Sequence, residues 1–485
     1  MNGAMIVYIL GQVLRIEGVL MMPSFAVGLI YGEQQGWTYL IWGLICVVLG
    51  SLISARKPKN TMIYLKEGCV STALCWIVLS VFGAVPFVLT GEIPRFIDAM
   101  FETVSGFTTT GSSILTDVEA MSHPSLFWRS FTHWIGGMGV LVFLLAVLPM
   151  AGGSQFQLMK AESPGPSVGK LVPKVGATAR ILYVIYFGMT VGLIVLLLLG
   201  GMDPFDAITI SFGTAGTGGF GVKADSCAGY SLYCIWVITV FMLLFGVNFN
   251  FYYFLTLKRI REAFKMEEVR WYFVIVAAAT GLCFLTLLDD FGSFEALTQA
   301  AFQVSSIITT TGFATTDFNI WHSAAKTVLV LLMFCGACAG STGGGIKVSR
   351  IVVFVKSAVK EVGSYIHPRS VKRVKVEGRP VEHEAIRSIN VYLTVYVLIF
   401  AVSVFIVSLE GKDLITTFTA VAATFNNIGP GLELVGPTAS FVHMTDLSKW
   451  TLIFDMLAGR LELFPMLILF HPTIWKQTFQ RKARK

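Results

Sequence analysis

Long apolar segments recur along the whole sequence, and they restrict the folds open to this chain more than any other feature. A helix that crosses a bilayer needs about 20 mostly apolar residues. Ten segments are expected to meet this requirement: 5–30, 37–55, 68–91, 125–150, 178–200, 230–257, 271–289, 324–339 with a continuation beyond it, 388–409 and 448–475. Only 13% of the residues are charged, whereas a soluble domain carries about 25%. These observations predict an all-α integral membrane protein with ten spanning helices.

Lysine and arginine residues cluster in five stretches, and two expected spans separate each stretch from the next. The stretches are 56–66, 160–180, 258–270, 347–387 and 476–485. Basic loops remain preferentially on the cytoplasmic side of a membrane. We therefore expect all five basic stretches, including the C-terminus, to be cytoplasmic.

Four shorter stretches, rich in Thr, Ser and Gly, lie between the two members of successive pairs of spans. They are residues 95–115, 204–222, 294–314 and 413–431. They are too short and too rich in hydroxyl groups to cross a bilayer, yet too apolar for ordinary loops, as is typical of re-entrant segments. All four fall on the side opposite the basic stretches. Each is therefore expected to enter the membrane from outside and to return there.

The four stretches also form an internal repeat, which can be aligned on one glycine in each copy: Gly111, Gly219, Gly312 and Gly429. The first and third copies share Thr-Thr-Thr-Gly, whereas the second and fourth keep little besides the glycine. The pattern predicts four pseudo-repeats of helix, pore helix, filter loop and helix around a central pore. The expected units are an N-terminal two-helix extension at 1–60 and pore repeats at 61–165, 166–265, 266–375 (with a gating loop) and 376–485.

Each re-entrant stretch is expected to begin with a short helix whose C-terminal end points toward the membrane centre. Pro94 and Pro204 suit a first helical turn, and Asp203, Ser293 and Asp413 suit N-caps. The negative end of such a helix dipole favours a cation. Entrances to the four stretches would be extracellular.

The Thr/Gly segment that follows each short helix cannot leave its carbonyl groups facing lipid. Facing a pore, those carbonyls can replace the hydration shell of a cation. A single such stretch could instead mark a close helix contact, but four copies on one side favour a selectivity filter. The candidate ion-binding residues are Thr108, Thr109, Thr110, Gly111, Gly216, Thr217, Gly218, Gly219, Thr309, Thr310, Thr311, Gly312, Asn426, Asn427, Ile428 and Gly429. The segments hold no cluster of His, Cys or carboxylate residues, which disfavours a transition-metal site.

A glycine-rich interruption, GSTGGGIK, breaks the apolar run of the third repeat. A helix interrupted within the membrane is tolerated where it lines a cavity or is buried in protein. The stretch is expected either to be a mobile gate below the filter or to be a fixed kink. The candidate gate residues in it are Gly340, Ser341, Thr342, Gly343, Gly344, Gly345 and Lys347.

Two arginines lie within apolar surroundings. Arg460 is expected in the middle of the last spanning helix, where a charge is costly and normally faces protein or water. It either projects into the pore beneath the filter, as a further gate residue, or forms a structural ion pair with Glu462 or Asp455. Arg129 lies near the start of a helix, where we expect it to reach the membrane surface as an anchor.

The motifs together resemble those of a known family. TTTGSS, GTGGFG, TTTGFATTD and NNIGPG, with WIGGMG, CAGSTGGGIKVSR and GRLELFP, are similar to the TrkH/KtrB-type potassium transporter subunits of prokaryotes. The resemblance covers nearly the whole chain, and the two extra N-terminal helices are closer to TrkH. It implies potassium uptake across the prokaryotic inner membrane by channel-like conduction of K⁺ and Rb⁺. K⁺ would be bound at the filter, and no organic cofactor is expected.

The same resemblance implies how the protein is assembled and controlled. The chain would form a homodimer with one pore in each protomer, with the glycine-rich break as an intramembrane gating loop and Arg460 near it in the pore. A cytosolic TrkA/KtrA-like ring of nucleotide-binding subunits would regulate it, since this chain has no nucleotide motif of its own. The basic stretch 347–387 would be either the docking surface for that ring or a contact with the membrane surface.

Other classes of function fit the sequence less well. A secondary cation symporter, coupled to Na⁺ or H⁺ and with a midplane site, usually has repeats of opposite topology, whereas these four share one. An enzyme is not expected, because the seven His residues are scattered and no spanning segment shows an acid–base pair. Nucleic acid is not an expected partner. The unequal filter copies predict modest selectivity for K⁺ over Na⁺.

Overall fold

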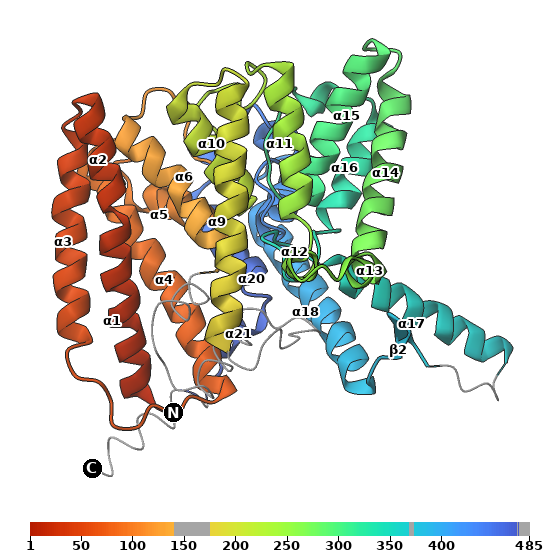
Figure 1. Ribbon diagram of the computed structural model, residues 1–485, viewed down its shortest axis with the longest axis horizontal. Helices are drawn as coiled ribbons and strands as arrows, with labels where there is room; N and C mark the ends of the chain where they lie inside the picture. Colours follow the sequence, from red (N-terminus) through yellow and green to blue (C-terminus); the bar gives the residue numbers. More distant parts are fainter. Residues whose placement is uncertain (140–174, 368–372, 473, 475–485) are drawn as a thin grey trace.

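The computed structural model describes residues 1–139, 175–367, 373–472 and 474, and in this part the chain is almost entirely helical (Figure 1). The helices are α1 (Gly3–Leu20), α2 (Met22–Tyr31), α3 (Gln35–Ile53), α4 (Leu65–Leu89), α5 (Phe96–Phe107), α6 (His123–Gly137), α9 (Val175–Leu199), α10 (Pro204–Gly216), α11 (Leu232–Phe245), α12 (Phe249–Thr256), α13 (Ile260–Lys265), α14 (Glu267–Leu287), α15 (Ser293–Ile308), α16 (Ser323–Met333), α17 (Val348–Ile366), α18 (His383–Ser408), α19 (Leu414–Phe425), α20 (Asp446–Arg460) and α21 (Phe464–Leu469). Three short 3₁₀ turns lie at Phe318–Ile320, Glu433–Val435 and Phe441–His443. A small antiparallel hairpin pairs β1 (Lys375–Val376) with β2 (Arg379–Pro380).

Several of these helices are long and apolar enough to cross a bilayer. In the described part there are six: Gly3–Tyr31, Gln35–Ile53, Leu65–Leu89, Arg180–Leu199, Glu267–Leu287 and His383–Ser408. The pair α11 and α12 would make a seventh, although a 91° bend separates its two halves. The expected integral membrane protein is thus supported, while the count of ten spans stays a prediction.

The remaining expected spans differ from straight helices in identifiable ways. The segment 230–257 bends at Gly246–Asn248, where the Asn248 side chain caps α12. The segment 324–339 is helical only to Met333, and 448–475 breaks after Arg460, because Glu462 and Leu463 have positive φ angles of 55° and 68°. The expected span 125–150 is helical to Gly137, and its residues from 140 onward lie outside the described part.

Four short helices share one packing arrangement. Each of α5, α10, α15 and α19 contacts the long helix before it and the helix after it: α4 and α6, α9 and α11, α14 and α16, and α18 and α20. Contacts between these groups run from α6 to α10, from α11 to α15, from α16 to α19 and from α20 back to α5. The four groups therefore close a ring, with α1 to α3 outside it against α4 and α6 (Figure 1).

The sequence predicted the starts of the short helices only in part. Asp203 caps α10 by accepting from the Phe205 amide at 2.9 Å, and Asp413 caps α19 by accepting from Thr416 at 2.8 Å, as expected. Ser293 is instead the first residue of α15, with Gly292 at the N-cap. Pro94 precedes the N-cap of α5, because that helix begins at Phe96.

The N-terminal hairpin is held by close approach of two helix backbones. Gly18 on α1 faces Gly43 on α3, and Gly11 faces Gly50 seven residues away on each helix. A Cβ atom on Gly18 would lie 2.3 Å from the carbonyl oxygen of Gly43. Small residues at such crossings let membrane helices approach closely enough for extensive van der Waals contact.

We expect Gly18→Val to lower the melting temperature of the purified protein in detergent. The added side chain cannot fit against the α3 backbone, and overpacking of this kind costs about 1–3 kcal/mol. Gly192→Val on α9 is the matched control, since a Cβ there meets no atom within 4 Å. Equal melting temperatures for the two variants would contradict the close α1–α3 contact.

Candidate functional site

The four short helices end in the same backbone conformation although their sequences differ. The residue two before each repeat glycine has a positive φ: 55° at Thr109, 53° at Thr217, 58° at Thr310 and 55° at Asn427. The next amide donates at 2.8 Å to the carbonyl five residues earlier in all four copies: Thr110 to Ser105, Gly218 to Gly213, Thr311 to Ser306 and Ile428 to Ala423. This bond and the left-handed residue define the Schellman ending of a helix. The chain therefore reverses direction in the same way in all four copies.

The repeat glycines bring these four reversals together in a ring. A Cβ on Gly111 would lie 2.0 Å from the carbonyl oxygen of Gly218, one on Gly219 would lie 2.0 Å from that of Thr311, one on Gly312 would lie 2.0 Å from that of Ile428, and one on Gly429 would lie 2.8 Å from that of Thr110. Each glycine therefore faces the carbonyl of the residue before the glycine in the next copy. Their φ angles run from +80° to +108°, which side chains disfavour. The sixteen candidate ion-binding residues of the sequence meet around this ring.

Hydroxyl and amide groups support the reversals from behind. Thr108 and Thr110 share a hydrogen bond of 2.8 Å, and Thr309 and Thr311 share one of 2.7 Å. The Asn427 amide donates at 3.0 Å to the Thr110 hydroxyl, which joins the fourth copy to the first.

Two buried oxygens at the ring have no such support. Among the described residues, the Thr109 hydroxyl and the Asn427 amide oxygen lack a hydrogen-bond partner. Most buried polar atoms in native structures have a hydrogen-bond partner, so these two oxygens are left available to a further group at the ring. The set of carbonyl, hydroxyl and amide oxygens suits a hard cation.

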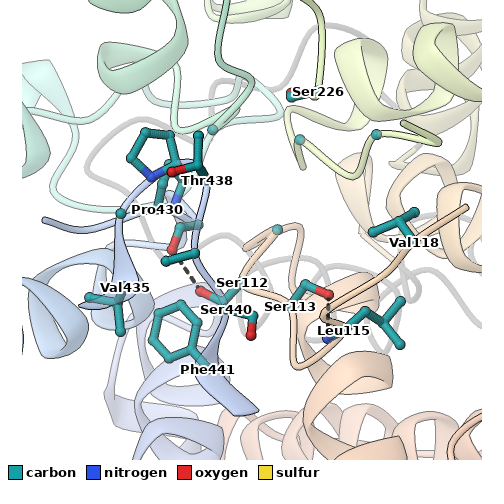
Figure 2. Close-up of a pocket in the computed structure, with 18 of the residues that line it drawn as sticks. Ser112, Ser113, Leu115, Val118, Ser226, Pro430, Val435, Thr438, Ser440 and Phe441 are labelled. Carbon is teal, nitrogen blue, oxygen red and sulfur yellow. Dashed lines mark hydrogen bonds between the residues drawn. The ribbon is translucent and has the colours of Figure 1, made fainter. Parts of the chain in front are cut away.

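A cavity of about 430 Å³ opens next to the ring, and we call it the vestibule. All four repeat glycines line it, together with segments that follow the first, second and fourth copies. Figure 2 shows its hydroxyl-rich wall, where Ser112 donates at 2.9 Å to the Gly429 carbonyl and Phe441 lies below it. The vestibule therefore leads to the ring on the side where the segments after the repeat glycines lie.

The expectation that Arg129 reaches the membrane surface is wrong. The residue is buried behind the ring, with only 3% of its surface exposed. Its Nε donates at 2.5 Å to Glu102 and its Nη1 donates at 2.8 Å to the Gly221 carbonyl. Glu102 also accepts from the Ser113 hydroxyl at 2.9 Å and from the Ile114 amide at 3.0 Å. The pair thus joins the segments that follow the first two repeat glycines.

His133 is a second buried link between these copies, and the sequence reasoning missed it. Its Nδ1 lies 2.7 Å from the Gly106 carbonyl, and its Nε2 accepts from the Phe220 amide at 3.2 Å. The imidazole of His133 packs against Gly218, where a Cβ atom would lie 2.3 Å from the imidazole. The histidine in THWIGG was the available signal, but its two partners are remote in sequence.

The glycine-rich stretch lies directly against the ring, on the side away from the vestibule. The Gly344 amide donates at 2.7 Å to the Thr310 hydroxyl. A Cβ on Gly343 would lie 3.0 Å from the Thr309 carbonyl, and one on Gly344 would lie 2.7 Å from the Asn427 side chain. Residues 342–347 are buried. Bulkier residues could not occupy this layer without moving the ring.

Arg460 is at the end of α20 and binds this stretch. Its guanidinium donates to the Thr342 carbonyl at 2.7 Å and to the carbonyls of Gly136 and Gly137 at 2.6 and 2.8 Å. The alternative ion pairs with its neighbours are wrong: Glu462 pairs with Arg350, and Asp455 accepts from Ser403 at 2.7 Å.

The two ends of the stretch are also anchored by charged groups. Lys347 is buried at the start of α17, and its ammonium donates to the carbonyls of Gly343 and Gly344. Glu268 at the start of α14 accepts from the Ala339 amide at 2.6 Å and from the Ser349 amide at 3.1 Å. The Gly340 carbonyl accepts from Phe249 at 3.0 Å.

Comparison with known proteins places this architecture in a family. A family model described as TrkH, cation transport protein, matches residues 35–477. The chain belongs to the TrkH family. The Trk system potassium uptake protein TrkH of Vibrio parahaemolyticus is 35% identical over 97% of this chain and 99% of its own length. The Escherichia coli K12 protein of that name is 35% identical over 96% and 97%, and E. coli TrkG is 32% identical over 97% and 98%.

A solved structure agrees with this assignment. The crystal structure of the potassium transporter TrkH from Vibrio parahaemolyticus matches with a TM-score of 0.88 and 33% identity, covering 98% of this chain and 100% of that one. The predicted resemblance to TrkH is therefore confirmed. The candidate site of this TrkH family member combines four reversals of like geometry with a loop that one arginine binds.

We expect Arg129→Met to destabilise this TrkH family member strongly, because it leaves the buried Glu102 carboxylate without the cation that balances its charge. Breaking one side of a buried pair costs about 3–5 kcal/mol. Thermal unfolding in detergent would measure it, and the double variant Glu102→Gln with Arg129→Met should lose less than the two single losses added together. Arg95→Met is the control, because its pair with Asp446 is exposed and is worth at most about 1 kcal/mol. Equal losses for Arg95→Met and Arg129→Met would contradict the structural role of the buried pair.

Proposed function

We propose that this protein takes up potassium across a prokaryotic inner membrane by channel-like conduction of K⁺, and of Rb⁺, through the ring of four chain reversals. The observation that carries this proposal is the cyclic contact of each repeat glycine with a carbonyl of the next copy. The relatives named as potassium uptake proteins, which are similar over nearly the whole chain, support it.

The chemistry of the ring fits a dehydrated monovalent cation. Rings of backbone carbonyls replace the hydration shell of K⁺ in selectivity filters. The four carbonyls that face glycines come from Thr110, Gly218, Thr311 and Ile428. The C-terminal ends of α5, α10, α15 and α19 precede them, and their dipoles favour positive charge. In this proposal the eight spans and four re-entrant helices of the predicted repeats surround the pore, the two spans of the N-terminal extension lie outside it, and the vestibule is extracellular.

In the proposed mechanism, residues 340–347 are the gate. The stretch is buried against Thr310 and Asn427 of the ring, and its hydrogen bonds to Arg460 and Thr310 hold it there. An ion leaving the ring would meet this layer next. Opening would require the Thr342 and Gly344 backbone groups to exchange these partners for others.

Assembly and control are proposed in the same terms. The protein would act as a homodimer, with one pore in each protomer, and a cytosolic TrkA/KtrA-like ring of nucleotide-binding subunits would regulate it. The relatives' name, Trk system, supports a transporter that works with further components. The basic residues of 347–387, a stretch that includes α17 directly after the gate, would be the docking surface for that ring.

The test is ⁸⁶Rb⁺ uptake into liposomes that contain only this chain, driven by a membrane potential without a Na⁺ or pH gradient. Uptake competed best by K⁺ among K⁺, Na⁺ and NH₄⁺ would support the proposal. We expect Gly312→Ala to lower the initial rate about tenfold or more, since a strained backbone position and a blocked carbonyl together cost about 1–3 kcal/mol. Gly281→Ala on α14 is the control, because a Cβ there meets no atom within 4 Å. Uptake that requires a Na⁺ or pH gradient would favour the symporter instead.

We expect Arg460→Ala to raise the rate of ⁸⁶Rb⁺ uptake, because it removes both a positive charge and the bond that holds the Thr342 carbonyl. Arg460→Lys retains the charge but cannot span the carbonyls of Thr342, Gly136 and Gly137 at once. A rise in both variants would indicate that the hydrogen bonds close the gate, whereas a rise in Arg460→Ala alone would assign the effect to charge. Unchanged uptake in both variants would contradict a gating role for Arg460.

A further inference from the structure

The vestibule has an uneven distribution of charge. Four ionisable side chains line it: Arg129, Lys223, Glu433 and His443. Arg129 is paired with Glu102, as described above. Lys223 lies 3.4 Å from a carboxylate oxygen of Asp206, and its ammonium lies over the Tyr230 ring at 4.5 Å. Both permanent positive charges of the lining are therefore balanced by carboxylates of their own.

Glu433 is not balanced in this way. Within the described part of the chain, no hydrogen-bond donor and no cation pairs with its carboxylate, and its side chain is exposed. It lies four residues after the fourth repeat glycine, at the start of the 3₁₀ turn Glu433–Val435. The lining thus keeps one uncompensated acidic group, with the imidazole of His443 as the other titratable side chain.

The backbone of Glu433 is held in place despite strain. Its φ is +54°, a left-handed conformation that residues with a side chain disfavour. The Asn319 side chain fixes it, because its Oδ1 accepts from the Glu433 amide at 2.9 Å and its Nδ2 lies 3.5 Å from the Glu433 carbonyl. Asn319 is itself lodged against Gly436, where a Cβ would lie 2.1 Å from Nδ2. A glycine would adopt this conformation without strain, so the position retains its carboxylate at a cost in stability.

We propose that Glu433 is a cation-binding residue of the vestibule: its fixed negative charge holds a hydrated monovalent cation ahead of the ring and raises the local cation concentration there. A cavity with low-dielectric walls focuses the field of such a charge, which raises the local concentration of counterions. The effect reaches about 10 Å at 0.1 M salt and is screened at higher ionic strength. The inference rests on the proposed function, since it concerns the cation that the ring conducts.

The experiment measures the ⁸⁶Rb⁺ concentration that gives half-maximal uptake into liposomes, at about 20 mM and about 500 mM ionic strength. Glu433→Gln and Glu433→Gly both remove the charge, and the glycine also relieves the backbone strain, so at least one is expected to fold. For both variants, the half-saturating concentration should rise about fivefold at low ionic strength and less than twofold at high ionic strength. Glu433→Asp should keep the value of the unaltered protein, and Glu295→Gln, an exposed carboxylate at the start of α15 outside the lining, is the control.

Two results would overturn the inference while leaving the proposed function intact. One is a half-saturating concentration in the charge-removing variants equal to that of the unaltered protein at low ionic strength. The other is an equal change at both ionic strengths, which would assign the residue a structural role. Absence of any uptake by the unaltered protein would instead overturn the proposed function, and this inference with it.

Discussion

The polar backbone groups at the ends of four buried helices constrain the rest of this structure. A carbonyl group away from water must find a partner, because leaving it unpaired in an apolar interior costs several kcal/mol. Each short helix satisfies its last turn through the same bond from the amide five residues on. The residue that donates this bond then presents its own carbonyl to the repeat glycine of the preceding copy instead of to apolar side chains. The ring closes only because the residue that receives each carbonyl has no Cβ.

This constraint explains why a geometry of such regularity survives sequences that have drifted apart. The left-handed position holds Thr in three copies and Asn in the fourth, each in a strained conformation. Neighbouring groups hold two of these residues: the Gly344 amide binds Thr310, and Asn427 donates to the Thr110 hydroxyl and to the Met456 carbonyl at 2.9 Å. The strained ring and the loop beneath it therefore share hydrogen bonds. A displacement of that loop would withdraw support from one of the four reversals.

The sequence predicted the features that repeat, and it missed those that depend on distant partners. Hydropathy and the four glycines located the helices and the ring, because apolar length and a positive φ leave local signatures. Arg129 was expected at the surface because its environment is made by Glu102 and Gly221, which lie 27 and 92 residues away. The pairing of Arg460 with Glu462 failed for a local reason: residues two apart on a helix do not face each other, and here the helix also ends between them. The bend at Gly246 likewise involves a distant partner, because the Gly246 carbonyl accepts from the Cys338 amide at 3.0 Å.

The charges nearest the ring largely cancel in pairs that also join its copies. Arg129 and Glu102 link the first copy to the second, and Lys449 donates at 2.6 Å to Asp98 between the fourth and the first. Breaking such a buried pair is costly, whereas the intact pair adds little net field. In the proposed pore, the field acting on an ion in the ring would therefore come mainly from carbonyl dipoles and helix ends. On the loop side, the Arg460 guanidinium donates to the carbonyl groups of Thr342, Gly136 and Gly137. In the proposed mechanism, a cation that crosses the ring would pass from oxygen ligands toward the guanidinium of Arg460, which would oppose tight retention of the ion.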